Sequence, residues 1–167
     1  VWAGGALASG RLYLGRAHTR SGSTSLSVLQ GIILGGLLLA VFLAGAFAVA
    51  RVPLLRGPVD ALLDHARYGS LPVVALITAI NGAAEELFFR GAAYAALPRR
   101  SNVAGSTLLY AASTLFSGVP LLTLAAASLG LLTALQRRVT GGVLGPIVTH
   151  LTWSLGMLVG LPWVFSR

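Results

Sequence analysis

The feature that most constrains this chain is the segment 28–50 (VLQGIILGGLLLAVFLAGAFAVA), which carries no charged side chain. An α-helix rises about 1.5 Å per residue, so this segment reaches about 34 Å and crosses a hydrocarbon layer about 30 Å thick. Of the 167 residues, 56% are hydrophobic and 10% are charged, whereas soluble domains carry roughly 25% charged residues. The sequence therefore predicts an all-α, polytopic transmembrane helix bundle, and it argues against a soluble enzyme or a disordered segment.

The apolar segments predict about five membrane spans. They are 28–50, 71–97, 102–118, 120–138 and 141–164. Residues 1–15 are interpreted as the end of a helix that is cut off upstream, so the chain is expected to be truncated at its N-terminus. We divide the chain into an N-terminal membrane region, 1–70, with one full span, and a four-helix membrane core, 71–167.

Polar segments separate these spans. Residues 16–27 are expected to form a basic loop. In 51–70, apolar and charged side chains are interleaved, which predicts a short helix in the membrane interface; they are Val59, Leu62 and Leu63 beside Asp60, Asp64 and Arg67. Within 28–50, Gly31 and Gly35 form a small-xxx-small pair that lets another helix approach closely.

The charges are mostly positive: twelve arginines, no lysine and four acids give a net charge of +8. The arginines are scattered between apolar runs and do not form one face, so we expect them to set membrane topology and not to bind nucleic acid. The absence of cysteine excludes disulfides and thiolate metal sites. Basic residues that are all arginine indicate a GC-rich bacterial genome, and the expected location is the plasma membrane.

Three ionisable residues lie inside the second span. Glu85, Glu86 and Arg90 stand near its middle, and Asn81, which we count as a supporting residue, lies one turn before Glu85. Ionisable groups at that depth are costly and must face a bundle interior or a water-filled cavity. Glu86 and Arg90 are spaced i,i+4 and can pair, while Glu85 is rotated by about 100° from Glu86. This predicts one structural carboxylate and one that is chemically available.

The fifth span contributes a histidine. His150 is the only histidine within a predicted span, and Ser154 follows one turn later on the same face. Pro146 cannot donate to a carbonyl four residues earlier, so we expect it to loosen the helix near Gly142. An imidazole and a hydroxyl below such a kink could line a cavity.

Each of these features also has a purely structural interpretation. Glu85, Glu86 and Arg90 could form an ion-pair network between packed helices, and His150 could be an ordinary interhelical hydrogen-bonding residue. The combination of the two segments is more informative than either one alone.

A Glu-Glu-x-x-x-Arg helix followed about 60 residues later by a His-bearing helix resembles the CPBP family. These are the CAAX-processing and bacteriocin-processing intramembrane proteases, also called the ABI or type II CAAX endopeptidase family. The first motif stands here as Glu85, Glu86, Leu87, Phe88, Phe89 and Arg90, followed by Gly91. The third motif, His-x-x-x-Asn, appears as His150 to Ser154 after Gly145 and Pro146. The resemblance covers roughly residues 70–163.

The chain departs from the family pattern at two positions. Ser154 stands where the third motif has Asn. The middle motif, Phe-x-x-x-His, is read as Phe116 to Pro120, so that a proline takes the place of the histidine. A proline side chain cannot accept a proton, bind a metal or orient a water.

The resemblance implies an intramembrane endopeptidase that hydrolyses a peptide bond of a membrane-associated substrate. In the family, the first Glu activates the water, and that role falls here to Glu85. Glu86 and Arg90 would hold the helix. His150 would stabilise the oxyanion or bind a metal, and Ser154 could replace the amide as a donor. Zinc generally needs at least three protein ligands, so with only Glu85 and His150 at hand a tightly bound zinc is disfavoured.

Two other functions remain open at this stage. A catalytically impaired family member, acting as a membrane binding or immunity-type partner, would explain Pro120 and Ser154. A small transporter subunit would use Glu85, Glu86 and His150 as a proton or cation relay. All three functions place the chain in a lipid bilayer.

The arginine distribution generates a topological prediction. With Arg11, Arg16, Arg20, Arg99, Arg100, Arg137 and Arg138 on one side, and Arg51, Arg56, Arg67 and Arg167 on the other, the richer side is expected to be cytoplasmic. Cysteines introduced at the Arg99–Arg100 and Arg137–Arg138 turns should resist membrane-impermeant thiol reagents in intact cells. Ready labelling from outside at either turn would contradict this orientation.

Overall fold

The computed structural model describes residues 1–10, 13–18, 24–67 and 70–166. These residues form a helical bundle with one small hairpin. The elements are α1 (Trp2–Ala8), β1 (Arg16–His18), β2 (Thr24–Leu26), α2 (Val28–Val49), α3 (Pro53–Arg67), α4 (Leu71–Glu86), the π-helix η1 (Leu87–Ala93), α5 (Tyr94–Ala96), α6 (Asn102–Thr114), the 3₁₀ turn η2 (Leu115–Ser117), α7 (Pro120–Thr140) and α8 (Leu144–Phe165).

Within the described residues, four helices are long and apolar enough to cross a membrane: Val28–Val49, Leu71–Ala96, Pro120–Thr140 and Leu144–Phe165. The span expected at 102–118 is instead α6, a helix of 13 residues, followed by the single turn η2. At about 1.5 Å per residue α6 reaches only about 20 Å, short of the hydrocarbon layer. The chain turns back at Gly118, which adopts a left-handed conformation with φ 74°. The all-α bundle is confirmed, with four such helices where about five were expected.

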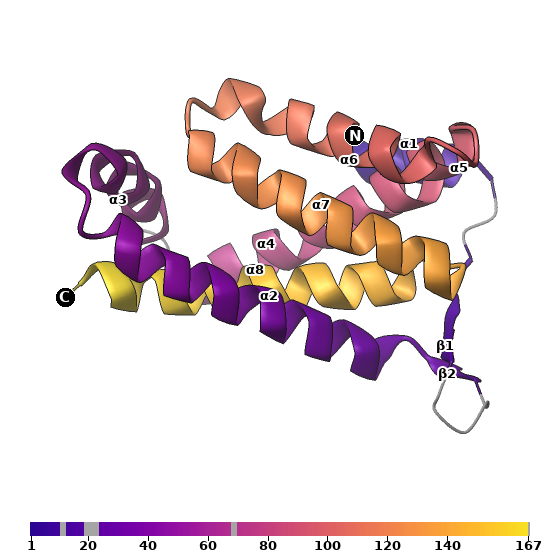
Figure 1. Ribbon diagram of the computed structural model, residues 1–167, viewed down its shortest axis with the longest axis horizontal. Coiled ribbons are helices and arrows are strands. Elements are labelled where there is room, and N and C mark those ends of the chain that lie inside the picture. The colour runs from indigo at the N-terminus through magenta and orange to yellow at the C-terminus, as the bar shows by residue number, and fades with distance from the viewer. Residues whose placement is uncertain (11–12, 19–23, 68–69, 167) are drawn as a thin grey trace.

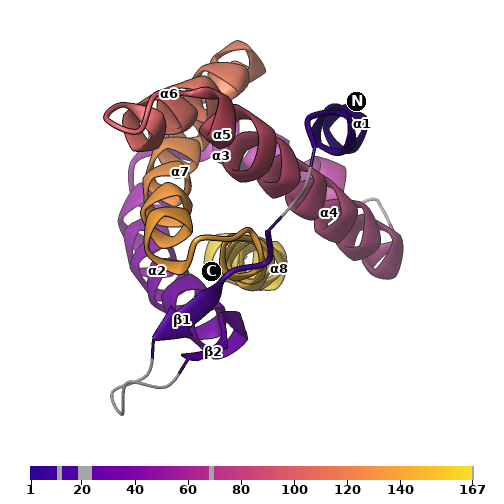
Figure 2. The ribbon, with the colours of Figure 1, turned by 90° about the vertical axis from the view of Figure 1, so that its right-hand side faces the viewer.

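The long helices lie side by side around α8 (Figures 1 and 2). α2 runs along α8, α6 and α7 form an antiparallel hairpin, and α4 crosses α8 on the side away from α2. The β1–β2 hairpin lies at one end of the bundle, and α3 with the C-terminus lies at the other (Figure 1). The helices of the predicted N-terminal region and of the predicted core therefore pack in one bundle.

A short hairpin stands where a basic loop was expected. Strands β1 and β2 pair antiparallel, with Ala17 opposite Ser25. The segment before β1 is also tied to the turn between α7 and α8, because the backbone N–H groups of Val143 and Leu144 donate to the carbonyl oxygens of Tyr13 and Leu14. This connection holds the start of α8 in place.

The described arginines of the two predicted groups lie at opposite ends of the bundle, as predicted. The Arg99–Arg100 turn and the Arg137–Arg138 end of α7 line one cavity and so share a side. At the opposite end, Arg56 Nη2 donates to the backbone oxygen of Phe165 at 3.3 Å. Arg11, Arg20, Arg167 and the side chain of Arg67 lie outside the described residues. The assignment of one side to the cytoplasm stays a prediction.

Helix α3 has the amphipathic character expected for 51–70. Val59 and Leu63 are buried in a cluster with Ala46, Val164 and Phe165 at the ends of α2 and α8. Leu54, in contrast, is 83% exposed. The side chains of Leu62, Asp64 and Arg67, which also entered that expectation, lie outside the described residues.

Pro146 does not loosen a helix near Gly142, and this expectation was wrong. Helix α8 begins at Leu144, so Pro146 stands in its first turn, where the backbone N–H groups have no partner within the helix in any case. Gly142 lies in the turn before the helix. The proline interior to α8 is Pro162.

The expected close approach at Gly31 and Gly35 is made against α8. A Cβ atom at Gly31 would come within 2.7 Å of Val148 Cβ, and one at Gly35 within 2.6 Å of the Thr149 backbone oxygen. Contacts that short do not occur in real structures. The two glycines therefore let α2 lie directly on the backbone of the helix that carries His150.

Gly35→Ala should lower the free energy of unfolding by about 1–3 kcal/mol, because the added methyl overpacks the α2–α8 contact. Gly36→Ala is the matched control: a Cβ there meets nothing within 4 Å, and alanine favours the helix. Thermal unfolding in detergent measures both variants. Equal melting temperatures for the two would contradict the packing.

Candidate active site

The site lies where the second long span changes its helical pitch. Glu85 and Glu86 end α4, and the next seven residues form the π-helix η1, which contains Arg90. Short π-helical insertions are rare and are frequent at functional sites. Gly82, one turn before Glu86, lies against the ring of His150, since a Cβ there would come within 3.3 Å of its Cδ2 atom. The helices α4 and α8 thus lie close together where the site residues meet.

Glu86 is the centre of a buried ionic cluster. Its Oε1 atom is 3.1 Å from Arg90 Nη1 and 2.8 Å from His150 Nδ1. Glu86 and Arg90 are 0% exposed, and His150 is 5% exposed. The predicted contact between Glu86 and Arg90 is confirmed. The bond from His150 to Glu86 was not predicted, because sequence reasoning assigned Glu86 to Arg90 alone.

Glu85 takes the available position that the helix geometry predicted. Its side chain is 27% exposed, and its Oε2 atom lies 4.0 Å from His150 Nε2. The two residues to which the resemblance assigns the reaction therefore face each other across the bundle. The distance is too long for a direct hydrogen bond and suits a bridging water.

Tyr110, which the sequence analysis did not single out, completes the site from α6. Its hydroxyl donates to Glu85 Oε2 at 2.8 Å. Its ring faces the Arg90 guanidinium, with Arg90 Cζ 4.6 Å from the ring centroid, and it packs with Phe89 and Leu129. Its position between Leu109 and Ala111 was the signal that could have identified it, because a buried tyrosine hydroxyl usually finds a hydrogen-bond partner.

Helix α7 supports the site with polar side chains that were also missed. Arg137 Nε donates to the backbone oxygen of Arg90 at 2.9 Å, inside η1. Gln136 accepts from Thr149 Oγ1 at 2.7 Å and donates to Gln30 Oε1 at 3.2 Å. These bonds join α2, α7 and α8 next to His150.

Two other predicted residues have different surroundings. Ser154 Oγ donates to the backbone oxygen of His150 at 2.9 Å, so its hydroxyl proton is used within α8. Asn81 lies on the exposed side of α4. A donor role for Ser154 and a supporting role for Asn81 stay predictions.

The residues assigned to the middle motif, Phe116 to Pro120, lie away from the site. Phe116 is 97% exposed, and Pro120 is exposed at the start of α7. Pro120 lies ten residues, or about 15 Å, before Gly130, which is the α7 residue beside Arg90. The aromatic ring at the site is that of Tyr110, and the residue four positions later is Thr114. The site therefore still lacks a second histidine at this spacing.

The donor set does not fit a tightly held zinc ion. Among the described residues, no three His, Cys, Asp or Glu side chains form a group that could hold a metal. Glu86 Oε1 is engaged by Arg90 and His150, which leaves Glu85 and His150 Nε2 as protein donors. Structural and catalytic zinc sites have at least three protein ligands.

The fold and the site define an integral membrane protein with a Glu-Glu-x-x-x-Arg helix facing a His-bearing helix. Residues 67–156 match the family model of type II CAAX prenyl endopeptidase Rce1-like proteins. Because the match covers more than half of the chain, the chain belongs to this family. No curated protein and no solved structure matches the chain.

The two carboxylates should differ sharply in their effect on stability. Glu86→Gln leaves Arg90 buried without a counter-charge and should lower the free energy of unfolding by about 3–5 kcal/mol. Glu85→Gln, at a partly exposed position, should cost no more than about 1 kcal/mol. Unfolding of the two variants in detergent, followed by circular dichroism, measures the difference. A loss at Glu85 as large as that at Glu86 would refute the assignment.

Proposed function

We propose that this chain is an intramembrane endopeptidase that hydrolyses a peptide bond of a membrane-associated substrate. The observation that carries the proposal is the environment of two adjacent carboxylates. Glu86 is fully buried and paired with Arg90, while Glu85 is partly exposed and faces His150 Nε2. A carboxylate that is reachable by water, beside an imidazole of fixed orientation, is the arrangement that general base catalysis requires.

His150 and Glu85 can hold the attacking water between them. We assign the Nδ1 proton of His150 to its contact with Glu86, because a carboxylate can only accept it. In the neutral ring Nε2 then accepts a hydrogen bond. A water that donates one proton to Nε2 and the other to Glu85 has a lone pair free for the carbonyl carbon.

Proton transfer follows from these positions. Glu85 removes a proton from the water as the oxygen attacks the carbonyl carbon, which gives a tetrahedral oxyanion. The protonated Glu85 then donates to the amide nitrogen as the C–N bond breaks, so one water is consumed and an acid and an amine leave. Tyr110, whose hydroxyl bonds Glu85 at 2.8 Å, is the donor best placed to turn toward the oxyanion.

An apolar cavity beside the site supports a substrate that reaches it from the membrane. The cavity, of about 470 Å³, lies between α2, α7 and α8, and its lining includes Phe42, Leu121 and Trp153. Trp153 also packs against the cluster around Phe89 and Tyr110. An apolar substrate segment in the cavity would therefore contact Trp153, which packs against the cluster that contains Tyr110.

A non-catalytic partner function is the second candidate. It is favoured by one observation: Thr114, four residues after the aromatic ring of the site, cannot supply an imidazole. Its hydroxyl donates to the backbone oxygen of Ala111 at 2.8 Å. The protein would then keep the family fold for binding, and Glu85 would be dispensable.

Glu85→Gln should abolish hydrolysis while the protein stays folded, and Tyr110→Phe should lower kcat by about 10²-fold through loss of one oxyanion donor. The assay uses the chain in proteoliposomes with quenched fluorescent peptides that carry a prenylated CAAX end or an acyl anchor. Tyr13→Phe is the control, since Tyr13 is 64% exposed and outside the site.

Cleavage by Glu85→Gln at the wild-type rate would overturn the mechanism. If the folded wild type cleaves none of these peptides, and Glu85→Gln has no phenotype in cells, the non-catalytic function replaces the proposal. A Tyr110→Phe variant with unchanged kcat would remove Tyr110 from the reaction and leave the role of Glu85 in place.

A further inference from the structure

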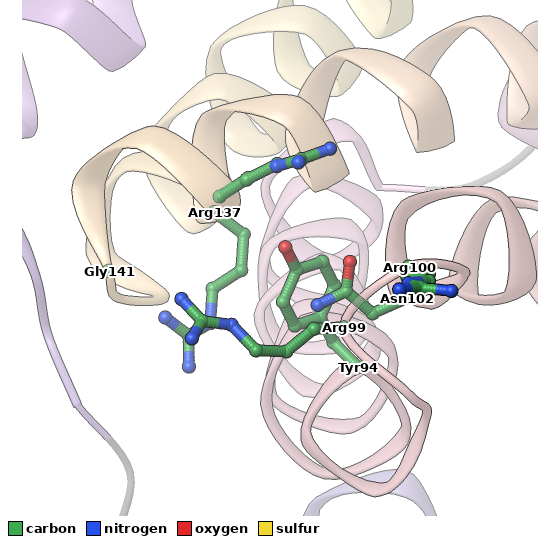
Figure 3. Close-up of a pocket in the computed structure, with 7 residues that line it drawn as sticks. Tyr94, Arg99, Arg100, Asn102, Arg137 and Gly141 are labelled. Carbon is green, nitrogen blue, oxygen red and sulfur yellow. The ribbon is translucent and has the colours of Figure 1, made fainter.

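A second cavity, which is lined by polar side chains, lies at the arginine-rich end of the bundle, apart from the Glu85 site. Its volume is about 410 Å³, within the range of about 300–1,000 Å³ that is typical of small-ligand sites. It lies between the α5–α6 turn and the end of α7, and Figure 3 shows the Arg99 side chain extending from that turn toward α7. The lining residues are Tyr94, Arg99, Arg100, Asn102, Arg137, Arg138 and Gly141.

The charge of this cavity is not balanced by the residues around it. Four arginines line it, and no acidic side chain is among the lining residues in the described part of the chain. Glu85 and Glu86 are engaged with Tyr110, Arg90 and His150. Four guanidinium groups around one space repel one another, and an anion that enters it relieves that repulsion.

A buried amide and a helix end add to the same space. Asn102 is 9% exposed, and its Oδ1 atom has no hydrogen-bond partner among the described residues. Asn102 lines the cavity, and its side-chain NH₂ group carries two N–H donors that an anion can accept. Asn102 is also the first residue of α6, whose unpaired backbone N–H groups and helix dipole favour a negative charge.

One of the arginines is pre-positioned, and it joins the cavity to the candidate active site. Arg137 Nε donates to the backbone oxygen of Arg90, and its guanidinium carbon lies 5.4 Å from the centroid of the Tyr94 ring. These contacts fix the side chain and leave its two terminal NH₂ groups for a ligand. Planar guanidinium groups with paired donors match the oxygens of a phosphate.

The cavity lies at the ends of two candidate membrane spans, the depth at which lipid headgroups are expected. The span Leu71–Ala96 ends just before Arg99, and the span Pro120–Thr140 carries Arg137 and Arg138 in its last turn. Basic pockets between membrane helices at that level bind the phosphates of anionic lipids. We infer that this cavity binds a phosphate group, supplied by the headgroup of an anionic phospholipid.

The test uses the full chain in nanodiscs of phosphatidylcholine, with and without phosphatidylglycerol. Phosphatidylglycerol should raise the melting temperature of the wild type and stay bound in native mass spectrometry. Arg99→Gln and Arg138→Gln should each weaken that binding about fivefold, the attraction expected for one arginine near an anionic lipid. Arg16→Gln, an exposed arginine on the same side in β1, is the matched control and should retain wild-type binding.

A second arm adds inorganic phosphate to nanodiscs of phosphatidylcholine alone. The inference requires phosphatidylglycerol to protect the protein more strongly than millimolar phosphate does. If free phosphate protects the wild type, the two cavity variants lose that protection and phosphatidylglycerol has no effect, the site takes a soluble phosphate and the lipid source is wrong. Equal phosphatidylglycerol binding by the wild type, both cavity variants and Arg16→Gln would overturn the site itself.

Discussion

The structure depends on one buried ionic cluster, in which Glu86 contacts both Arg90 and His150. Removing such charges from water costs several kcal/mol each, so they persist in a membrane bundle only when they are paired. The pairing joins the α4–η1 helix to α8 and fixes the orientation of the imidazole. Gly82 on one side and the α2 glycines on the other allow the backbones to come close enough for these contacts.

This cluster gives the two adjacent glutamates, Glu85 and Glu86, different roles. Because Glu86 is held by two partners, Glu85 is left at the edge of the site, where it is partly exposed and accepts a hydrogen bond from the Tyr110 hydroxyl. The rotation of about 100° between successive helical residues is the physical reason for the separation. A single carboxylate could not both neutralise the buried Arg90 and remain accessible as a general base.

Helix-periodic features were predictable from the sequence, whereas features that depend on partners from other helices were not. The Glu86–Arg90 contact follows from i,i+4 spacing, and the approach of His150 follows from the paired motifs. Tyr110 was missed because its role depends on how α6 packs on α4. The segment 102–118 was wrongly expected to span the membrane, because apolar content does not show where a short helix ends and the chain turns back. Pro146 was misjudged because its effect depends on where α8 begins.

The most direct test of the account is a pair of double-mutant cycles on the free energy of unfolding. One cycle combines Glu86→Gln with His150→Gln, and the other combines Glu85→Gln with the same His150 change. The account predicts a coupling energy above about 1.5 kcal/mol for Glu86 with His150 and below about 0.5 kcal/mol for Glu85 with His150. A coupling of Glu85 with His150 that equals or exceeds that of Glu86 would contradict the division between a structural and a reactive carboxylate.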